Sequence, residues 1–396
     1  MTENTVFKER IRFPIPTREL ARRWSLVREA MQAQGIDLLV MQNDNKFLGG
    51  YVRYFIDIPA EHAYPVTVLF PVDDEMTTIF HSSAQNPAPP AWSARGIKTR
   101  QGAPYLRTLH YTNHYDAEEI VKVIKGRKDK KVGIVGMGLI NAALYQYLHE
   151  HLPHVDWVDA SDLVDEIKAV KSEDELIYVR ESVKVHDAFA SAMPAIIRPG
   201  IYEYEIRAEI KRLLENLGSE EQLIMLGSSP AGTPTPHLDT FFQNRQLNSG
   251  DQILIMVEAN GPGGFYSEIM RTWCLGEPSQ ELHDLWEASK KIQDFAASLL
   301  KPGANPPEII DQVNRFMSKT GFPPEGRLFG HGQGYDLVER PAFVKHETLK
   351  LKANMVVALH PILANDKAFA CCCDDFLITE NGAERLQKTP QELIIL

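Results

Sequence analysis

The chain has 396 residues, of which 44% are hydrophobic and 24% are charged, a composition typical of a soluble globular protein with two domains. Its net charge of −11 argues against nucleic acid or an anionic membrane surface as the main partner. The polar N-terminus lacks the apolar core of a signal peptide, and no run of apolar residues is long enough to span a membrane, so we expect a cytoplasmic protein.

Helices and strands alternate in the first part of the chain. Apolar side chains at helical spacing predict a helix over 18–34, which ends at Gly35. The same reasoning predicts two further helices and five strands, namely helices over 117–124 and 141–151 and strands over 37–41, 64–70, 76–80, 131–135 and 155–158. This alternation predicts an α/β domain with a mainly parallel or mixed sheet.

The pattern changes near residue 168, where helices and hairpins replace the alternation. Ser172 followed by Glu175 matches a capping box at the start of a long helix that we expect to end near Pro194. Further helices are predicted over 203–217, 280–300 and 307–320, and late strands over 355–359 and 376–379. The pattern predicts an N-terminal α/β domain over 1–168 and a C-terminal α+β domain over 169–396.

The stretch 250–273 reads as a β-hairpin whose turn is the glycine-rich segment 260–264. Because side chains alternate faces along a strand, a turn about Gly263 would place Glu258 and Glu268 opposite each other. Two carboxylates paired across apolar strands repel, so such a pair requires a metal ion, a cationic substrate or a shared proton. The alternative is that this face is exposed and both glutamates are ordinary surface residues.

Several motifs, in this order and spacing, resemble the creatinase/prolidase/aminopeptidase P superfamily. They are Lys168–Glu175, Thr235–His237, the 250–272 hairpin, Gly330–Gly334 with Glu339 and Pro341, His360–Pro361 and Ile378–Gly382. The resemblance implies a C-terminal "pita-bread" catalytic domain after residue 168. It also implies a small-molecule substrate and a homodimer.

The metallopeptidases of that family hold two metal ions with two aspartates, one histidine and two glutamates. By position, the corresponding residues here are Met256, Glu268, His331, His360 and Cys373, and a slipped register would give the last role to Asp374 or Asp375. A thioether is a poor ligand for hard cations, so we do not expect a two-metal site.

The remaining ligands suit a single divalent transition metal. Glu268, His331 and His360 offer one carboxylate and two imidazoles, the donors that bind iron, zinc or manganese. Glu258 and Asp375 are further candidate ligands. A metal-free site that uses the same residues as acid, base and hydrogen-bonding groups is the alternative.

The resemblance also implies residues that act on the substrate. His237 would transfer a proton, together with His331, and Glu339 would orient His237 or the substrate; surface or capping roles are the alternatives for His237 and Glu339. Arg53 and Tyr54 in the N-terminal domain and Met270 on the hairpin are candidate substrate contacts, with packing as the alternative. The thiols in the run Cys371–Cys373 are interpreted as packing residues rather than as nucleophiles.

The favoured hypothesis is an enzyme, a hydrolase or lyase that acts on a C–N or neighbouring bond of a small molecule. One alternative is an Xaa-Pro dipeptidase or aminopeptidase with a relaxed ligand set. Another is a binding protein that has lost catalysis. Other polar groups replace the family's metal ligands in an ordered way, which argues against a binding protein whose active site has simply been lost.

Overall fold

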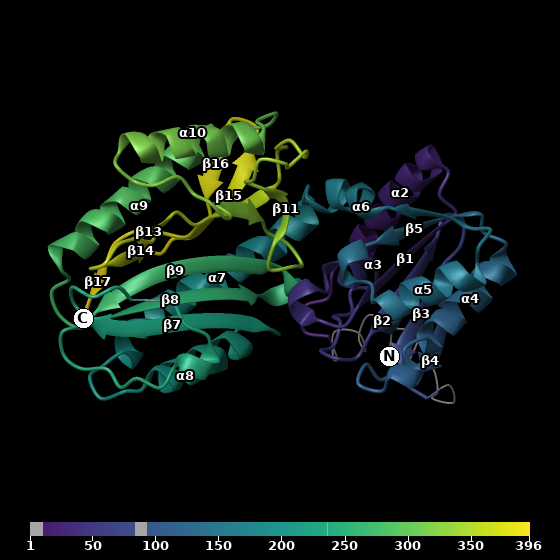
Figure 1. The fold of residues 1–396 in the computed structure, drawn as a ribbon, viewed down its shortest axis with the longest axis horizontal. Coiled ribbons are helices and arrows are strands. Elements are labelled where there is room, and N and C mark those ends of the chain that lie inside the picture. The colour runs from purple at the N-terminus through teal and green to yellow at the C-terminus, as the bar shows by residue number, and fades with distance from the viewer. Residues whose placement is uncertain (1–10, 84–92, 236) are drawn as a thin grey trace. The chain divides into compact units, whose positions relative to one another are not determined.

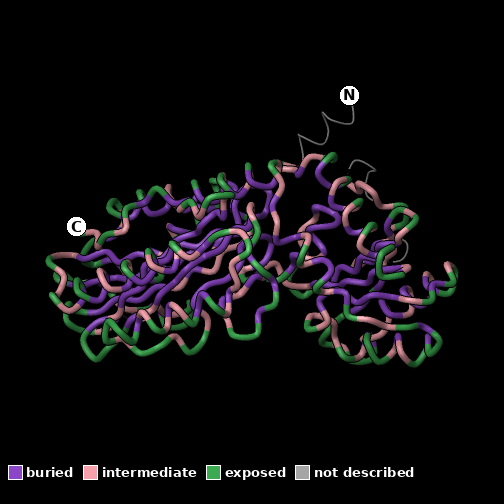
Figure 2. Tube along the Cα trace, turned by 90° about the horizontal axis from the view of Figure 1, so that it is seen from above, coloured by how far each residue is buried: buried purple, intermediate pink, exposed green. Residues whose placement is uncertain are grey.

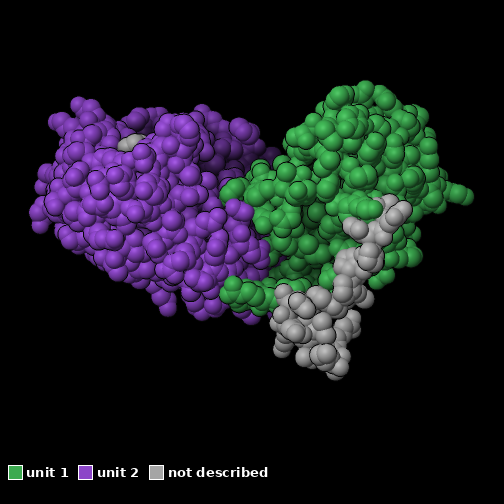
Figure 3. Space-filling view, turned by 90° about the horizontal axis from the view of Figure 1, so that it is seen from below, with its two compact units in different colours: residues 1–168 green, residues 169–396 purple. Residues whose placement is uncertain are grey.

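The computed structural model describes residues 11–83, 93–235 and 237–396. The N-terminal stretch 1–10 and Pro236 of the predicted histidine loop therefore lie outside the described residues. The chain divides into two compact units, residues 1–168 and residues 169–396 (Figure 3). No helix in the described ranges combines the length and the apolar character that crossing a membrane requires.

Unit 1 is built around one six-stranded mixed sheet in the order β4-β3-β2-β1-β5-β6 (Figure 1). Strand β1 lies near its middle and pairs antiparallel with β2 and parallel with β5. The strands are β1 Leu38–Asn43, β2 Val66–Pro71, β3 Met76–His81, β4 Ile97–Ala103, β5 Lys131–Val135 and β6 Asp156–Asp159. The helices are α2 Thr17–Gln34, α3 Gly50–Ile56, α4 Tyr115–Arg127, α5 Ala142–His151 and α6 Ser161–Lys168. Every predicted element of this unit is present, and β4 is a strand that the sequence pattern did not reveal.

Unit 2 begins with two helices that cover one face of a four-stranded sheet (Figure 1). The sheet has the order β17-β9-β8-β7, and the elements are α7 Glu173–Ile196, α8 Glu203–Asn216, β7 Gln222–Pro230, β8 Asp251–Asn260, β9 Tyr266–Cys274 and β17 Ile394–Ile395. The predicted capping box of Ser172 and Glu175 starts α7. The hairpin turns at Gly263, whose φ of 75° lies in the left-handed region that favours glycine. In the resulting register Glu258 pairs directly with Glu268, as the alternation predicted.

The second half of unit 2 places two further helices over the remaining strands. A five-stranded sheet has the order β11-β10-β12-β15-β16, and β13 pairs with β14. The elements are α9 Gln280–Leu299, α10 Pro306–Lys319, β10 Gly330–Gly332, β11 Glu339–Ala342, β12 Val356–Leu359, β13 Ile362–Ala364, β14 Phe369–Cys371, β15 Asp374–Thr379 and β16 Gly382–Arg385. Residues on β12, β14 and β15 share an apolar core with α9 and α10.

Strand alternation also gives the strands of unit 2 an inner face that points away from the two helix-covered cores. On β8, Ile253, Ile255 and Val257 join the core with α7 and α8, which directs Glu258 to the opposite face. The side chains of the three consecutive cysteines at the end of β14 also alternate between two faces, and Cys372 packs in the core that includes α9. Cys371 and Cys373 instead contact the inner side of the hairpin, and Figure 2 shows that the interior of unit 2 is buried along the strands.

We expect alanine at Gly261 to destabilise unit 2. A Cβ there would lie 2.5 Å from the Ser182 Cα on α7, so the helix or the hairpin must shift. Overpacking of this kind costs about 1–3 kcal/mol. Urea unfolding of Gly261→Ala measures the loss, and Gly326→Ala is the matched control because a Cβ at Gly326 meets nothing within 4 Å. Equal stability of the two variants would contradict the expected close contact with α7.

Candidate metal centre

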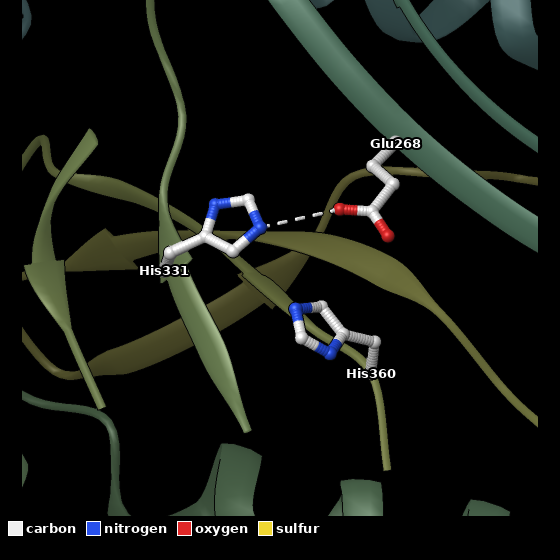
Figure 4. Close-up of side chains that lie close together, drawn as sticks. All are labelled: Glu268, His331 and His360. Atoms are coloured by element: carbon white, nitrogen blue, oxygen red, sulfur yellow. Dashed lines mark ion pairs between the residues drawn. The ribbon is translucent and has the colours of Figure 1, made fainter. Parts of the chain in front are cut away.

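Three buried side chains from separate strands converge on the inner face of unit 2 (Figure 4). Glu268 comes from β9, His331 from β10, and His360 directly follows β12. One potential ligand atom from each lies within 4.8 Å of the others. The Nε2 atom of His331 is 3.5 Å from a carboxylate oxygen of Glu268. The structure therefore brings together the carboxylate and the two imidazoles that the sequence nominated.

The backbone fixes the orientation of the His331 ring. Its Nδ1 atom lies 3.0 Å from the carbonyl oxygen of Gly332, and an N–H at that position donates to the carbonyl. Nε2 then faces Glu268, which is the orientation that a ligating histidine adopts when its other nitrogen is anchored to a carbonyl. Burial lowers the pKa of His331, but the Glu268 carboxylate outweighs this effect and raises the pKa above its ordinary value. The Glu268 carboxylate therefore favours the protonated form of His331 when no metal is bound.

The Glu268 carboxylate is ionised, and only one of its two oxygens accepts a hydrogen bond. Burial raises its pKa, but His360 and His331 outweigh burial and bring the pKa to about 2. The Cys373 thiol donates to Oε1 at 3.1 Å, whereas Oε2 is buried, accepts no hydrogen bond from any described residue and has only the ion pair with His331 Nε2 at 3.5 Å. A buried anionic oxygen without a donor is destabilising unless a cation faces it.

The donor set fits a single divalent cation. One carboxylate and two imidazoles are the ligands that suit zinc and non-haem iron. The anchored His331 ring presents Nε2 to the Glu268 Oε2 atom at 3.5 Å, and a His360 ring nitrogen lies within 4.8 Å of a ligand atom of each. The three described residues therefore have the chemistry and the spacing of a metal centre.

Glu258 lies opposite Glu268 across the hairpin and is half-buried rather than fully exposed. Burial and the neighbouring Glu268 charge raise the pKa of Glu258 to about 8, whereas the pKa of Glu268 is low. The pair therefore carries one negative charge and one proton at neutral pH. This corresponds to the shared proton, one of the three possibilities that the sequence pattern raised. Glu258 does not belong to the three-residue cluster.

We expect the free energy of unfolding of the metal-free protein to fall as pH rises, because Glu258 loses its proton. Its pKa is about 8 in the folded protein and 4.5 in an ordinary glutamate, so its stabilising contribution is complete below pH 4.5 and is lost as pH rises through 8. Between pH 5 and pH 8 we expect the stability of the parent to fall about 3.5 kcal/mol more than that of Glu258→Gln. Urea unfolding at the two pH values measures this difference. Parallel profiles for parent and variant would show that Glu258 titrates normally.

Asp375 lies behind Glu268 rather than in the cluster. One of its carboxylate oxygens accepts from the Ser267 hydroxyl at 2.5 Å, the Glu268 backbone N–H at 3.2 Å and the Gln387 amide at 3.0 Å. The other oxygen is buried without a hydrogen-bond partner among the described residues. Burial raises the pKa of Asp375 to about 7. In this arrangement Asp375 supports the β9 backbone at Glu268, and its predicted ligand role stays a prediction.

Sulfur atoms and apolar groups fill the position next to the cluster. Met256 pairs with Met270 across the hairpin, and both pack with Leu254, Cys371 and Cys373. Burial raises the pKa of the Cys373 thiol well above its ordinary value, so Cys373 acts here as a neutral donor to Glu268. Met270 is buried in this packing, and its predicted substrate contact stays a prediction.

The structure places His237, predicted to transfer a proton, and Glu339, predicted to orient it or the substrate, in different surroundings. His237 is half-buried in the loop after β7, with its ring centroid 5.5 Å from that of Phe369. Glu339 is buried at the start of β11, where it accepts from the Tyr335 backbone N–H at 2.6 Å and lies 3.3 Å from the Lys171 ammonium. These contacts give Glu339 a loop-capping function beside its predicted catalytic one.

Arg53 and Tyr54 lie in α3 of unit 1, and both are buried there. The Arg23 guanidinium stacks over the Tyr54 ring at 4.6 Å from its centroid. The Arg53 charge acts on the buried Asp57. Both side chains therefore contribute to the packing of unit 1, and their predicted contact with substrate stays a prediction.

The sequence reasoning missed one cation beside the cluster. Arg327 is exposed, four residues before His331, and its charge acts on His237, Glu258 and His360. The only signal in the sequence is its position on the segment that leads into the Gly330–Gly334 motif.

Comparison with known proteins gives one family and a consistent fold. Residues 178–380 match the model of Metallopeptidase family M24. The chain is 27% identical over 395 residues to the uncharacterized hydrolase/peptidase y4tL of Sinorhizobium fredii, covering 96% of this chain and 97% of that protein. It is 25% identical over 424 residues to the ectoine hydrolase of Halomonas elongata, covering 97% and 99% of the two chains. The structure of an Xaa-Pro dipeptidase from Bacillus anthracis superposes with a TM-score of 0.77 at 21% identity, covering 95% of this chain and 100% of that one.

Proposed function

We propose, from the premise that this chain belongs to Metallopeptidase family M24, that it is a hydrolase which cleaves a C–N bond of a small molecule with one divalent metal ion. Glu268, His331 and His360 would hold the ion. The family match and the likeness to the Bacillus anthracis structure confirm the predicted superfamily and its two-domain pita-bread fold.

The observation that carries the proposal is the convergence of three buried ligand atoms within 4.8 Å in a member of a metallopeptidase family. A single ion is favoured over two because Met256, Met270 and Cys373 pack against one another beside the cluster. Those side chains offer two thioethers and a neutral thiol where a second hard cation would need carboxylates.

The ion would act as a Lewis acid that polarises the substrate and lowers the pKa of water. The chain's own residues would handle the protons. Burial and then the Arg327 charge lower the pKa of His237, so its ring is neutral near pH 7 and can accept a proton. Glu258, with a pKa of about 8, can donate one to the leaving nitrogen.

Hydrolysis is tested directly with a small panel of compounds. Protein loaded with zinc, manganese or iron is incubated with ectoine, an Xaa-Pro dipeptide and N-acetyl amino acids in water enriched in ¹⁸O, and the products are identified by mass spectrometry. The proposal expects a metal-dependent product that contains solvent oxygen and is absent with Glu268→Gln. A product without solvent oxygen would favour a lyase, and undiminished turnover after removal of all metal would reject the metal centre.

The pH dependence of turnover is expected to report His237. Because its pKa lies below the ordinary value of 6.5, activity should fall only as pH decreases through that lower value. We expect His237→Asn to lower kcat about 10²–10⁴-fold and to remove this acid limb. A variant that keeps the limb would assign it to another group.

The likeness in fold to the Bacillus anthracis enzyme supports the Xaa-Pro dipeptidase alternative. It predicts that the Xaa-Pro dipeptide is the best substrate of the panel. Loss of cluster ligands with no change in any cellular activity would instead favour a non-catalytic binding protein.

A further inference from the structure

Two polar side chains interrupt the apolar face that α9 turns toward the strands. Ser289 and Gln293 are both completely buried, whereas the other buried residues of this helix are hydrophobic. Residues four apart lie on the same face of a helix, one turn from each other. A buried hydroxyl or amide group is destabilising unless it is hydrogen-bonded, so both side chains require partners on the strands that α9 covers.

The strands beneath these two side chains contain a gap in their pairing. Strand β12 pairs antiparallel with β15 as far as Leu359. The same register resumes at Ile362, where β13 pairs with β14. Between these positions, 360–361 and 372–373 lie opposite each other in that register, but the described residues form no ladder pair there. The gap therefore lies at His360, one of the three candidate ligands.

The chemistry of proline accounts for part of this gap. The Asn365 N–H donates to the Ala368 carbonyl at 3.0 Å, and hydrogen-bonded pairs alternate along an antiparallel ladder. Counted from that pair, Pro361 and Cys372 would be a hydrogen-bonded pair. Proline has no N–H, so the Cys372 carbonyl cannot receive its donor from the opposite strand.

Ser289 stands between the groups that the other ladder bond would join. Its hydroxyl donates to the Pro361 carbonyl at 2.8 Å and accepts from the Cys372 N–H at 3.0 Å. A direct bond between that N–H and that carbonyl is thus replaced by two bonds through the hydroxyl. The strands are linked here through α9 rather than to each other.

Gln293 supplies the donor that proline lacks. Its amide nitrogen lies 2.8 Å from the Cys372 carbonyl oxygen and 3.0 Å from the Leu359 carbonyl oxygen. Carbonyl oxygens only accept, so this end of the side chain is the NH2 group, which donates one hydrogen to each. Because the His360 N–H also donates to the Phe329 carbonyl at 3.0 Å, the backbone around His360 is held from several sides.

We propose that Ser289 and Gln293 are positioning residues of the metal centre, which hold the ladder open at His360 so that its ring reaches Glu268. This inference rests on the proposed function and adds two residues to it. The same two side chains bind the backbone just before Cys373, whose thiol donates to Glu268 at 3.1 Å. One helix therefore sets the surroundings of two candidate ligands that come from different strands.

Metal affinity and a spectroscopic signature test the inference. Ser289→Ala removes the bridging hydroxyl, and Gln293→Met removes the two amide donors with little change in shape. We expect each variant to raise the Kd for zinc, measured by competition with a chromophoric chelator, about 10- to 100-fold, because the ligands keep their chemistry but lose their fixed placement. The visible spectrum of the cobalt-loaded protein, which reports the geometry of the ligands, should change in the same variants.

Two controls separate positioning from general loss of stability. Ser298→Ala on α9 removes an exposed hydroxyl that donates only to the Phe295 carbonyl of its own helix, and it should change neither measurement. Val313→Ala on α10 removes buried methyl groups from the same core and should lower Tm while it leaves the Kd for zinc unchanged. A zinc-binding parent whose Kd is the same in Ser289→Ala and Gln293→Met would overturn the inference.

A measurement on the metal-free protein keeps this inference separate from the proposed function. In protein with ¹³C-labelled histidine rings, the His360 signal is assigned by its loss in His360→Gln. We expect this signal to shift in Ser289→Ala and Gln293→Met but not in Ser298→Ala. A parent that binds neither zinc nor cobalt would reject the metal centre alone, and an unchanged His360 signal in both variants would then overturn the positioning role as well.

Discussion

Alanine at His331 is expected to abolish tight metal binding. The parent protein, dialysed after loading with zinc, should retain one ion per chain, and its thermal stability should rise with the logarithm of the free zinc concentration above the Kd. Loss of His331 leaves two ligands and removes the group that pairs with Glu268 Oε2. Loss of a group that merely orients a ligand weakens metal binding about 10–100-fold, so loss of a ligand should cost at least about 100-fold.

Elemental analysis by mass spectrometry measures the stoichiometry, and the shift in Tm with added zinc measures the affinity. His283→Ala is the matched control, because His283 is an exposed histidine on α9 of the same unit and is not part of the cluster. A parent protein that gains neither metal nor stability would exclude the centre. Full retention of zinc by His331→Ala would remove His331 from the ligand set.

Substitution of Arg271 by methionine is expected to cause a large loss of stability. Arg271 on β9 is completely buried and lies 2.5 Å from a carboxylate oxygen of Asp374 on β15. It also donates to the carbonyls of Met270, Cys373 and Pro390. Its removal leaves a buried carboxylate without its main cation, which costs about 3–5 kcal/mol.

Urea unfolding of Arg271→Met gives this loss, and the double variant Arg271→Met with Asp374→Leu should recover part of it because no unpaired charge remains. Arg212→Met on α8 removes an exposed ion pair with Glu209 and should change stability little. A double variant that is less stable than the sum of both single losses would show that the pair is not the source of the effect. Since this pair joins β9 to β15, the same variants also test how the hairpin is held against the second sheet.

Local patterns were sufficient for most elements of the fold. Period-two alternation placed Glu258 and Glu268 in one register because a hairpin with a short turn fixes every later pair of residues. The capping box at Ser172 began α7 at the expected residue because it satisfies backbone donors within one turn. By contrast, β7 was missed, although it pairs along β8 from Gln222 to Pro230, because long-range pairing rather than its own sequence makes it a strand.

The sequence by itself nominated Glu268, His331 and His360 as candidate ligands, because the order and spacing of its motifs resemble one family. Only the tertiary structure decided how those residues are charged and what surrounds them. The pKa of Glu258 is high and that of Glu268 is low because of their buried neighbours. The packing also makes Cys373 a hydrogen-bond donor to Glu268 and places Asp375 against the β9 backbone. It also brings Arg327 beside the cluster. The physical reason is that the pKa of a side chain and the hydrogen bonds of a buried oxygen depend on neighbours from distant segments. The packing of the two sheets determines which segments become neighbours.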